Sequence, residues 1–294
     1  RAPEAVCSCS LSAPVYIPET TETCKHIIKD FLLPQLLNRE TTIEDYVSSI
    51  QHLKDNNLAK HAVESALWEI QSIKENIPIW KMIGGTRTEI PVGESIGVQF
   101  DIDHLLKVTE KRIEEGYQRI KIKIRPGWDI SPVKAIRKRF PKLSLMVDAN
   151  SAYTLKDIHI LKALDKFNLV MIEQPLAYDD IIDHAKVQKE LKTPICLDES
   201  ILSAEDARKA IEIDACRIIN VKPGRISGLS ECIKINKIAK KYKIPLWCGG
   251  MLETGIGKVY NLAAASLSEF KLPADIVPAS TFFKEDLTTP DNKV

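Results

Sequence analysis

From residue 119 to residue 125 the chain reads RIKIKIR, a run in which basic and β-branched residues alternate without a break. Side chains two positions apart share one face of a strand, so the isoleucines cover one face and the cations the other. The isoleucine face suits packing under helices, which leaves Lys121 and Lys123 facing the interior of a barrel. The alternative is an exposed edge strand with a solvated basic face. Acidic residues at the ends of the neighbouring runs favour the barrel, because they balance buried positive charge.

This run is the first of five apolar runs that each end in a charged residue. The charged residues recur at intervals of 24 or 25 residues and are Lys123, Asp148, Glu173, Asp198 and Lys222. A strand, a helix and two loops occupy roughly that length. The interval therefore indicates a repeated strand–helix unit that delivers one charge at the end of each strand.

The same rhythm extends from Ile90 to near the end of the chain. Strands are expected at residues 90–96, 119–124, 143–148, 168–173, 194–198, 216–221, 244–248 and 274–277, with helical patterns between them. Eight strands alternating with helices predict an α/β fold of the modified (β/α)8 type, a TIM barrel with its helices outside. The carboxyl ends of the strands then meet at one mouth, where such barrels hold their active sites.

The residues before the barrel follow a different pattern. Helical periodicity covers residues 18–37, restarts at Thr42 and covers residues 58–75. No strand–helix alternation is present there. The first 85 or so residues therefore form a separate, mainly helical segment.

Three carboxylates at strand ends predict a metal site. Asp148, Glu173 and Asp198 supply hard oxygen ligands and no soft ones, which selects Mg2+, with Mn2+ possible, over zinc. The alternative is that each carboxylate caps the helix after its strand. Three such residues at equal intervals beside two lysines favour the metal.

The sequence assigns acid–base chemistry to lysine. All six histidines fall in helical segments or at their ends. Lys123 and Lys222 then need depressed pKa values to act as bases. For Lys123, the neighbouring Lys121 and the bound cation would favour the neutral amine. Arg225 would act in the same way on Lys222.

A pair of glycines follows the seventh expected strand. Gly249 and Gly250, with Gly255 and Gly257 beyond them, resemble the phosphate-binding loops of many barrels. Their spacing matches neither a dinucleotide-binding nor a Walker pattern. Room for the backbone close to a substrate is the favoured interpretation, and a phosphate site is the alternative.

Composition excludes several classes of protein. In 294 residues the apolar content is 44%, the charged content 28% and the net charge +1. Such a balance gives no electrostatic basis for binding nucleic acid or an anionic membrane. No apolar run approaches the roughly 18 residues of a membrane span, and the N-terminus does not have the pattern of a signal peptide. Seven cysteines without a C-x-x-C pair indicate a reduced, cytoplasmic location.

Six short motifs together resemble one known family. They are Lys121-Ile122-Lys123, Asp148-Ala149-Asn150, Ile172-Glu173-Gln174-Pro175, Leu197-Asp198-Glu199-Ser200, Asn220-Val221-Lys222-Pro223-Gly224-Arg225 and Trp247 to Gly255. The combination closely resembles the enolase superfamily in its muconate-lactonizing branch, and within it the o-succinylbenzoate synthase and N-succinylamino acid racemase family. The resemblance runs from about Ser12 to Pro278.

The resemblance implies a mechanism. Asp148, Glu173 and Asp198 would hold Mg2+, and Lys123 and Lys222 would lie on opposite faces of a carboxylate substrate. Removing the α-proton then gives an enediolate that the cation stabilises. Lys123 takes the proton and returns it to a departing hydroxyl, while protonated Lys222 stabilises the anion. Residues implied to bind the substrate or to support these groups are Lys121, Asn150, Arg225, Gly249, Gly250, Met251, Ser12 and Tyr16.

The implied activity is that of an o-succinylbenzoate synthase of menaquinone synthesis, acting on a small-molecule carboxylate as a homo-oligomer. N-succinylamino acid racemase is the close alternative, and a muconate cycloisomerase-like enzyme is a further one. A dipeptide epimerase is disfavoured, because residues 274–277 read ADIV and lack a D-x-D pattern.

The resemblance also implies a domain organisation. Residues 1–88 would form a partial capping domain with most of its sheet missing, 89–280 the barrel and 281–294 a short tail. The alternative from another class is a metal-binding barrel without turnover, because the lid would be incomplete.

Overall fold

The computed structural model describes residues 16–288, beginning with a group of short helices. Thr20 and Thr42 each start a helix with a capping box, in which the threonine hydroxyl accepts from the backbone three residues later. The continuous helix expected at 18–37 is three segments, and Pro34 lies in the last of them. The segments of this region are α2 (Thr21–Ile27), η1 (Ile28–Leu32), η2 (Leu33–Gln35), α3 (Ile43–Ser49), α4 (Asn57–Glu75) and α5 (Ile79–Met82).

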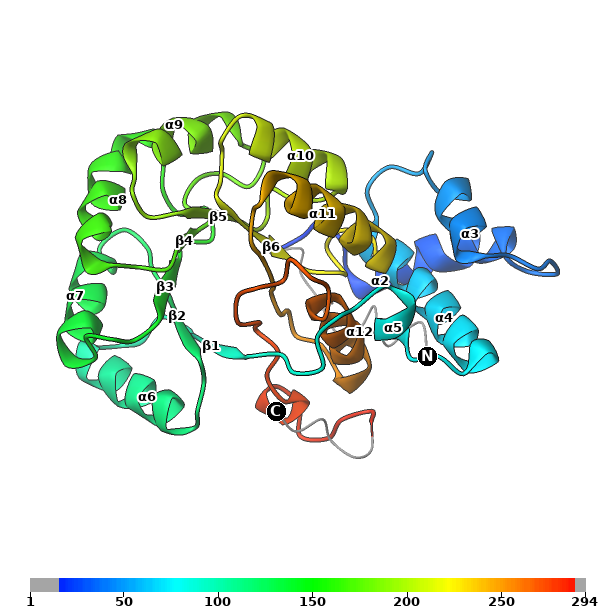
Figure 1. Cartoon of the computed structure of the whole chain (residues 1–294), viewed down its shortest axis with the longest axis horizontal. Helices are drawn as coiled ribbons and strands as arrows, with labels where there is room; N and C mark the ends of the chain where they lie inside the picture. The colour runs from blue at the N-terminus through cyan, green and yellow to red at the C-terminus, as the bar shows by residue number, and fades with distance from the viewer. Residues whose placement is uncertain (1–15, 289–294) are drawn as a thin grey trace.

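A curled parallel sheet follows, and its strands are neighbours in sequence order. The strands are β1 (Gly93–Ile96), β2 (Arg119–Lys123), β3 (Leu145–Asp148), β4 (Ile172–Glu173), β5 (Ile195–Leu197), β6 (Ile218–Val221) and β7 (Leu246–Cys248). The helices between them are α6 (Ile102–Glu114), α7 (Ile130–Arg139), α8 (Ile158–Leu164), α9 (Ile182–Glu190), α10 (Ala204–Glu212), α11 (Leu229–Tyr242) and α12 (Gly255–Ala265). Short 3-10 turns lie at η3 (Leu155–Asp157), η4 (Asp165–Phe167) and η5 (Ala279–Thr281). In Figure 1 helices α6 to α10 form an arc outside the strands, so the predicted α/β barrel architecture is confirmed.

The eighth strand expected at 274–277 is not formed as a strand. Two isolated parallel bridges stand in its place, one joining Phe270 to Leu246 of β7 and the other joining Ala274 to Val92 before β1. The Ala274 carbonyl accepts from Gly93 N at 2.8 Å, and Asp275 N donates to the Cys248 carbonyl at 2.9 Å. Pro273 in this segment has no N–H to donate, which limits a longer ladder. The segment nevertheless links the two edges of the sheet.

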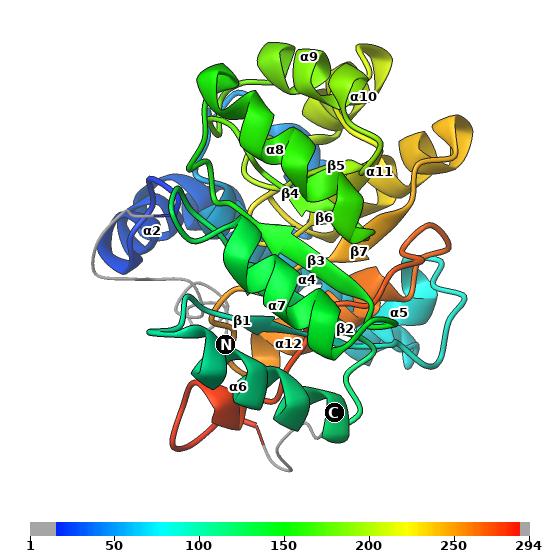
Figure 2. The same ribbon diagram turned by 90° about the vertical axis from the view of Figure 1, so that its left-hand side faces the viewer.

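The RIKIKIR run has the two faces that its alternation predicts. Ile120, Ile122 and Ile124 are at most 3% exposed and belong to the main hydrophobic core. Because β2 pairs with β1 on one side and with β3 on the other, the alternative of an exposed edge strand is wrong. Figure 2 shows helix α7 lying across the outside of β2 and β3. Lys121 is 4% exposed and lies on the inner face.

The helical segment is anchored to the barrel through α4. Asn57 Nδ2 donates to the Arg225 carbonyl at 2.7 Å, and Ser227 Oγ donates to Asn57 Oδ1 at 2.6 Å. Ser230 N donates to Glu64 Oε1 at 2.8 Å. These contacts reach the loop between β6 and α11 and the first turn of α11, and Figure 1 shows α2 to α4 grouped beside α11. Over residues 16–288 no helix combines the length and the apolarity needed to cross a membrane.

Burial of His61 on α4 gives the fold a pH-dependent stability. Burial lowers the pKa of His61 from 6.5 to about 4. Between these values the unfolded chain binds a proton that the folded chain does not, so stability falls as the pH falls through this window. From pH 7 to pH 5 we expect this group to lower the free energy of unfolding by about 2 kcal/mol. Urea unfolding of the wild type and of His61→Gln at both pH values measures this difference.

The matched control for this measurement is His52→Gln, since His52 is exposed. This control is expected to keep the pH dependence of the wild type. If His61→Gln also keeps the full pH dependence, the expectation is contradicted.

Candidate active site

The five evenly spaced charges lie at the carboxyl ends of five consecutive strands. Lys123 and Asp148 end β2 and β3 and are register partners, and Glu173 is the partner of Asp148 on β4. Asp198 and Lys222 come directly after β5 and β6. Since β2 and β6 are four strands apart in a barrel of seven strands and one closing segment, the two lysines approach the mouth from opposite sides.

Asp148 lies between two lysines. Its Oδ2 accepts from Lys123 Nζ at 2.6 Å and is 3.6 Å from Lys121 Nζ. Burial alone would raise the pKa of Asp148, but the charges of Lys123 and Lys121 lower it below its ordinary value. Asn150 accepts a second hydrogen bond from Lys123 at 2.5 Å and donates one to Glu199. The carboxylate is therefore ionised and paired at the edge of the mouth.

Glu173 is the most deeply placed of the three carboxylates, with no exposed surface. Its Oε2 accepts from Lys121 Nζ at 3.2 Å, and its Oε1 accepts from Asn220 Nδ2 at 2.6 Å. Burial and the charge of Asp148 raise the pKa of Glu173. Additional positive charge at this point would favour the ionised carboxylate.

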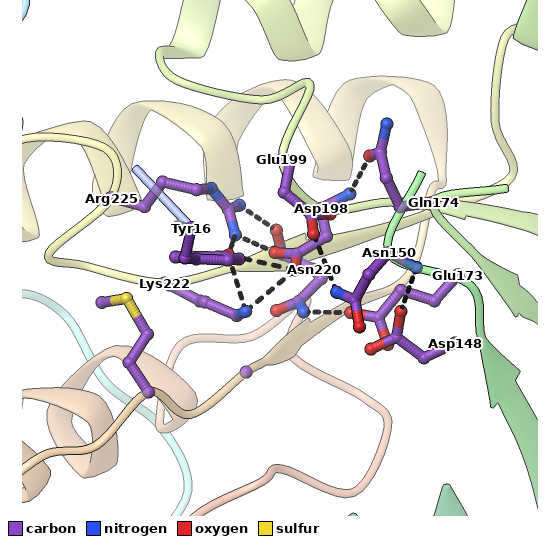
Figure 3. Close-up of polar contacts among 12 residues, drawn as sticks. Tyr16, Asp148, Asn150, Glu173, Gln174, Asp198, Glu199, Asn220, Lys222 and Arg225 are labelled. Carbon is purple, nitrogen blue, oxygen red and sulfur yellow. Dashed lines mark hydrogen bonds and ion pairs between the residues drawn. The ribbon is translucent and has the colours of Figure 1, made fainter. Parts of the chain in front are cut away.

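Asp198 is held by three groups that converge from other elements (Figure 3). Lys222 Nζ donates to Asp198 Oδ2 at 2.8 Å, and the Tyr16 hydroxyl donates to the same oxygen at 3.1 Å. Arg225 pairs with the other oxygen, Oδ1. The Tyr16 hydroxyl also accepts from Lys222 at 2.7 Å, so the segment before α2 brings an aromatic ring against the second lysine.

The expectation of a depressed pKa at Lys222 is wrong for this structure. Burial alone would lower the pKa of Lys222, but Tyr16, Glu173 and Glu199 raise it above its ordinary value. Arg225 pairs with Asp198 instead of repelling the lysine. The Lys222 side chain is therefore an ammonium group surrounded by acceptors.

Lys121 has a partner that the sequence analysis missed. Its Nζ lies 2.7 Å from Asp275 Oδ2, and Arg119 Nη2 donates to Asp275 Oδ1 at 2.6 Å. Both cations lie 4.9 Å from the ring of Trp247. Burial alone would raise the pKa of Asp275, but Arg119 and Lys121 lower it to about 2. Asp275 could have been found in the sequence as the acidic residue of the last expected strand, 274–277, in a barrel whose strand at 119–125 has a basic face.

The sequence analysis also missed the amide of Gln174 and the carboxylate of Glu199, although each residue directly follows a predicted metal ligand. Gln174 Oε1 accepts from Asp198 N at 3.0 Å, which ties the end of β4 to the end of β5. Glu199 lies beside Asp198, is 9% exposed and faces the same cavity as the two lysines. Their position beside a strand-end charge was the only signal that could have found them.

The predicted glycines lie where a side chain would collide with the site. A Cβ on Gly249 would lie 2.2 Å from Asn220 Oδ1 and 2.6 Å from Lys222 Cε. A Cβ on Gly250 would lie 2.3 Å from the Asp275 carbonyl oxygen. Met251 lines the cavity and also packs on the hydrophobic cluster of α2 to α4. Ser12 lies outside the described residues.

A cavity of about 630 Å3 opens above these charges. This volume lies in the range of small-molecule sites. Lys123 and Lys222 line it, as do Lys121, Asn150 and Tyr16, whereas the carboxylates of Asp148, Glu173 and Asp198 lie beneath its surface. Residues of the lining that the sequence analysis did not select are Glu94, Ser95, Gly97, Ser151, Tyr178, Glu199, Leu252, Glu253, Lys258, Asp275, Val277, Thr281 and Phe282.

The oxygen atoms of Asp148, Glu173 and Asp198 are suitable ligands for a hard divalent cation, but in this structure they form ion pairs with basic side chains. Among residues 16–288 no three acidic, histidine or cysteine side chains form a ready coordination group. The carboxylates of three neighbouring strands face ammonium and guanidinium groups instead. Two buried acceptors in the described part, Glu199 Oε2 and Asn220 Oδ1, have no hydrogen-bond partner.

Comparison with known proteins agrees with this architecture. Residues 8–84 match the mandelate racemase/muconate lactonizing enzyme N-terminal domain, and residues 104–294 match the enolase C-terminal domain-like family. The chain belongs to the mandelate racemase/muconate lactonizing group of the enolase superfamily, whose enzymes generally use a divalent metal.

Two functional names recur among relatives that are 41–50% identical to this chain. The o-succinylbenzoate synthase of Bacillus subtilis is 50% identical over 97% of this chain and 77% of its own length. The N-succinylamino acid racemase of Thermus thermophilus is 44% identical over 93% of this chain and 74% of its own length. A crystal structure of an enolase-superfamily member from Listeria innocua superposes with a TM-score of 0.93 at 44% identity, covering 97% of this chain and 77% of that one.

Proposed function

We propose that this protein is an o-succinylbenzoate synthase. The observation that carries the proposal is the placement of Lys123 and Lys222 on opposite sides of one cavity, above three buried carboxylates. Relatives named o-succinylbenzoate synthase at 44–50% identity support it. The reaction would be loss of water from 2-succinyl-6-hydroxy-2,4-cyclohexadiene-1-carboxylate, a step of menaquinone synthesis.

In this proposal Lys123 is the base. Its side chain is about 30% exposed, so it reaches the cavity while Asp148 and Asn150 fix its position. The neutral amine removes the proton next to the substrate carboxylate, and the resulting ammonium returns it to the departing hydroxyl. The C–H and C–O bonds break, the ring gains a double bond and water leaves, so no oxidant is needed.

Lys222 has the complementary role. Its ammonium is held by Asp198 and Tyr16 on the opposite wall of the cavity. A fixed positive charge there stabilises the negative charge that develops after the proton has left. Arg225, 1% exposed and bonded to the Ile201 and Asn220 carbonyls, holds Asp198 in place. Gly249 leaves the space that the Lys222 side chain occupies.

Asp148, Glu173 and Asp198 are proposed to hold Mg2+, for which Mn2+ is an alternative, because all three offer hard oxygen donors. When bound, the cation supplies positive charge that stabilises a substrate carboxylate gaining electron density. The chain's own contribution is to present three carboxylates from adjacent strands and to keep water away from them. Lys121 and its partner Asp275 form part of the wall of the same cavity.

A racemase activity toward N-succinylamino acids is the second candidate. The two lysines approach from opposite sides, which is the geometry for removing a proton on one face and delivering it on the other. The relatives named N-succinylamino acid racemase support it. Both reactions start with removal of the same kind of proton, so one site serves both.

The domain organisation and setting are part of the proposal. Residues 1–88 form the cap, 89–280 the catalytic barrel and 281–294 the tail, in a cytoplasmic homo-oligomer. Anchoring of α4 to the loop after β6 supports the role of the cap. The five cysteines of the described part are free thiols, as in a reducing compartment.

Incubation of the purified full-length protein with the cyclohexadiene substrate and Mg2+ tests the proposed function. We expect dehydration that stops in the presence of a chelator and returns when Mg2+ or Mn2+ is added, because the proposed reaction depends on the cation to stabilise the substrate carboxylate as it gains electron density. The absorbance change on aromatisation measures the rate. A protein that binds Mg2+ without turning over the substrate would instead be a metal-binding barrel. For the racemase, the absence of α-deuterium exchange by either enantiomer of an N-succinylamino acid rules the activity out.

A further inference from the structure

One lysine of the cavity has no part in the mechanism above. Lys258 lies in the second turn of α12, is 3% exposed and lines the cavity that contains Lys123 and Lys222. Its Nζ lies 5.5 Å from the centre of the Phe282 ring. A buried cation that borders a ligand cavity is a specific recognition group, because its charge acts in a medium of low dielectric constant.

One carboxylate of the chain, that of Asp286, lies near Lys258 in this structure. Gly255 N, at the start of α12, donates to Asp286 Oδ1 at 2.8 Å. Slight burial would raise the pKa of Asp286, but this hydrogen bond and the charge of Lys258 contribute to lowering it. The positive end of the α12 dipole lies at the same place. Thr254 Oγ1, just before α12, is buried and has no hydrogen-bond partner among residues 16–288.

An apolar wall leads from the reacting end of the cavity to Lys258. Gly249 touches Lys222, and the chain then runs through Met251 and Leu252 into α12, with both side chains on the cavity. Val277 and Phe282 also belong to the apolar part of the lining. The one acid of this stretch, Glu253, accepts from Met251 N with both of its oxygens at 2.8 Å, so its carboxylate is directed at the backbone.

We propose that Lys258 binds a second carboxylate, at the far end of a dicarboxylate substrate, and so sets the preference for substrates with a succinyl group. The inference rests on the proposed function and adds a specificity residue to it. In this arrangement one substrate carboxylate is used at the Lys123 and Lys222 end, the methylene groups of the succinyl chain lie along Met251 and Leu252, and the terminal carboxylate pairs with Lys258. The cavity of about 630 Å3 is large enough for a ligand of that size.

Substitution of Lys258 tests this inference with a pair of ligands. The pair is the normal substrate and the same compound with its terminal carboxylate replaced by a primary carboxamide. The wild type is expected to prefer the carboxylate by about tenfold to a hundredfold in kcat/KM, since a hydrogen bond to a charged group is involved. Lys258→Met should lose this preference through KM and retain its turnover of the carboxamide, whereas Lys258→Arg should keep most of the preference.

Lys138→Met is the matched control, because Lys138 is exposed on α7. It should behave as the wild type does. Retention of the full preference by Lys258→Met would overturn the inference while leaving the proposed function intact.

A binding measurement separates the inference from the proposed function. Calorimetry with o-succinylbenzoate and its terminal carboxamide, in the presence of Mg2+, compares the wild type with Lys258→Met. We expect Lys258→Met to bind o-succinylbenzoate more weakly than the wild type does and to bind the carboxamide as well as the wild type does. Equal binding of both ligands by both proteins would overturn the inference. Absence of turnover by the wild type would contradict the proposed function, and the calorimetry still decides the role of Lys258.

Discussion

Replacing Lys123 with alanine is expected to lower kcat for the dehydration by about 10³-fold, within the range that a positioned general base contributes. Lys123 hydrogen bonds Asp148 at 2.6 Å and Asn150 at 2.5 Å, so its amine is held in one place at the mouth. Alanine removes the amine and leaves the backbone of β2 in register with β3. Initial rates at saturating substrate and Mg2+, with circular dichroism as a check on folding, measure the effect.

The control for this variant is Lys138→Ala, since Lys138 is exposed on α7. The control should keep the wild-type kcat. Equal values of kcat for Lys123→Ala and for the wild type would refute the assignment of Lys123 as the base.

If the racemase activity is present, substitution of Lys123 and of Lys222 is expected to affect different enantiomers of the substrate. Lys123→Ala should lose α-deuterium exchange with one enantiomer of an N-succinylamino acid and retain some with the other, and Lys222→Ala should show the reverse. The reason is that each lysine reaches one face of the α-carbon. Identical loss with both enantiomers in both variants would contradict this arrangement.

The second large effect is expected at Glu173. Glu173→Gln should weaken Mg2+ or Mn2+ binding by at least about 100-fold, a factor that partners outside the ligand set alone can reach, and should reduce dehydration to background. Glutamine keeps the size and the hydrogen bond from Asn220 but removes a negative charge between Asp148 and Lys121. Calorimetric titration with Mg2+, or with Mn2+ followed by electron paramagnetic resonance, measures the affinity.

Glu64→Gln provides the matched control for the loss of one buried carboxylate. Glu64 is 2% exposed and lies on α4, where it accepts from Trp68 Nε1 and Ser230 N, both at 2.8 Å. This variant should bind the cation as the wild type does. Unchanged affinity in Glu173→Gln, or an equal loss in Glu64→Gln, would remove Glu173 from the ligand set.

The barrel could be predicted because its strands can be recognised from local sequence patterns. Alternation along RIKIKIR, followed by acidic strand ends at a constant interval, indicated both the period of the repeat and the direction in which the charges point. The segment 270–275 was predicted less well. It closes the barrel through bridges alone, and a stretch with a proline and few paired residues has no strand periodicity to detect.

The carboxylates and lysines at strand ends could be named from spacing, but their partners could not. Asp275 meets Lys121 because the segment 270–275 closes the barrel, and the spacing of residues along the chain gives no record of that contact. The pKa of Lys222 shows the same limit. Tyr16, more than two hundred residues away in the chain, and nearby carboxylates raise it, whereas the local sequence offered only Arg225 as a neighbour.

The bonds from α4 to the loop after β6 constrain any exchange of parts between relatives. Asn57 donates to the backbone carbonyl of Arg225, in the loop that follows Lys222, and Glu64 accepts from the backbone N–H of Ser230 at the start of α11. A chimera that takes residues 21–75 from another member of the family therefore replaces these contacts near Lys222 together with the capping helices. Grafts that keep an amide at position 57 and a hydrogen-bond acceptor at position 64 preserve these two contacts, and grafts that lack them lose the contacts although they change only the capping helices.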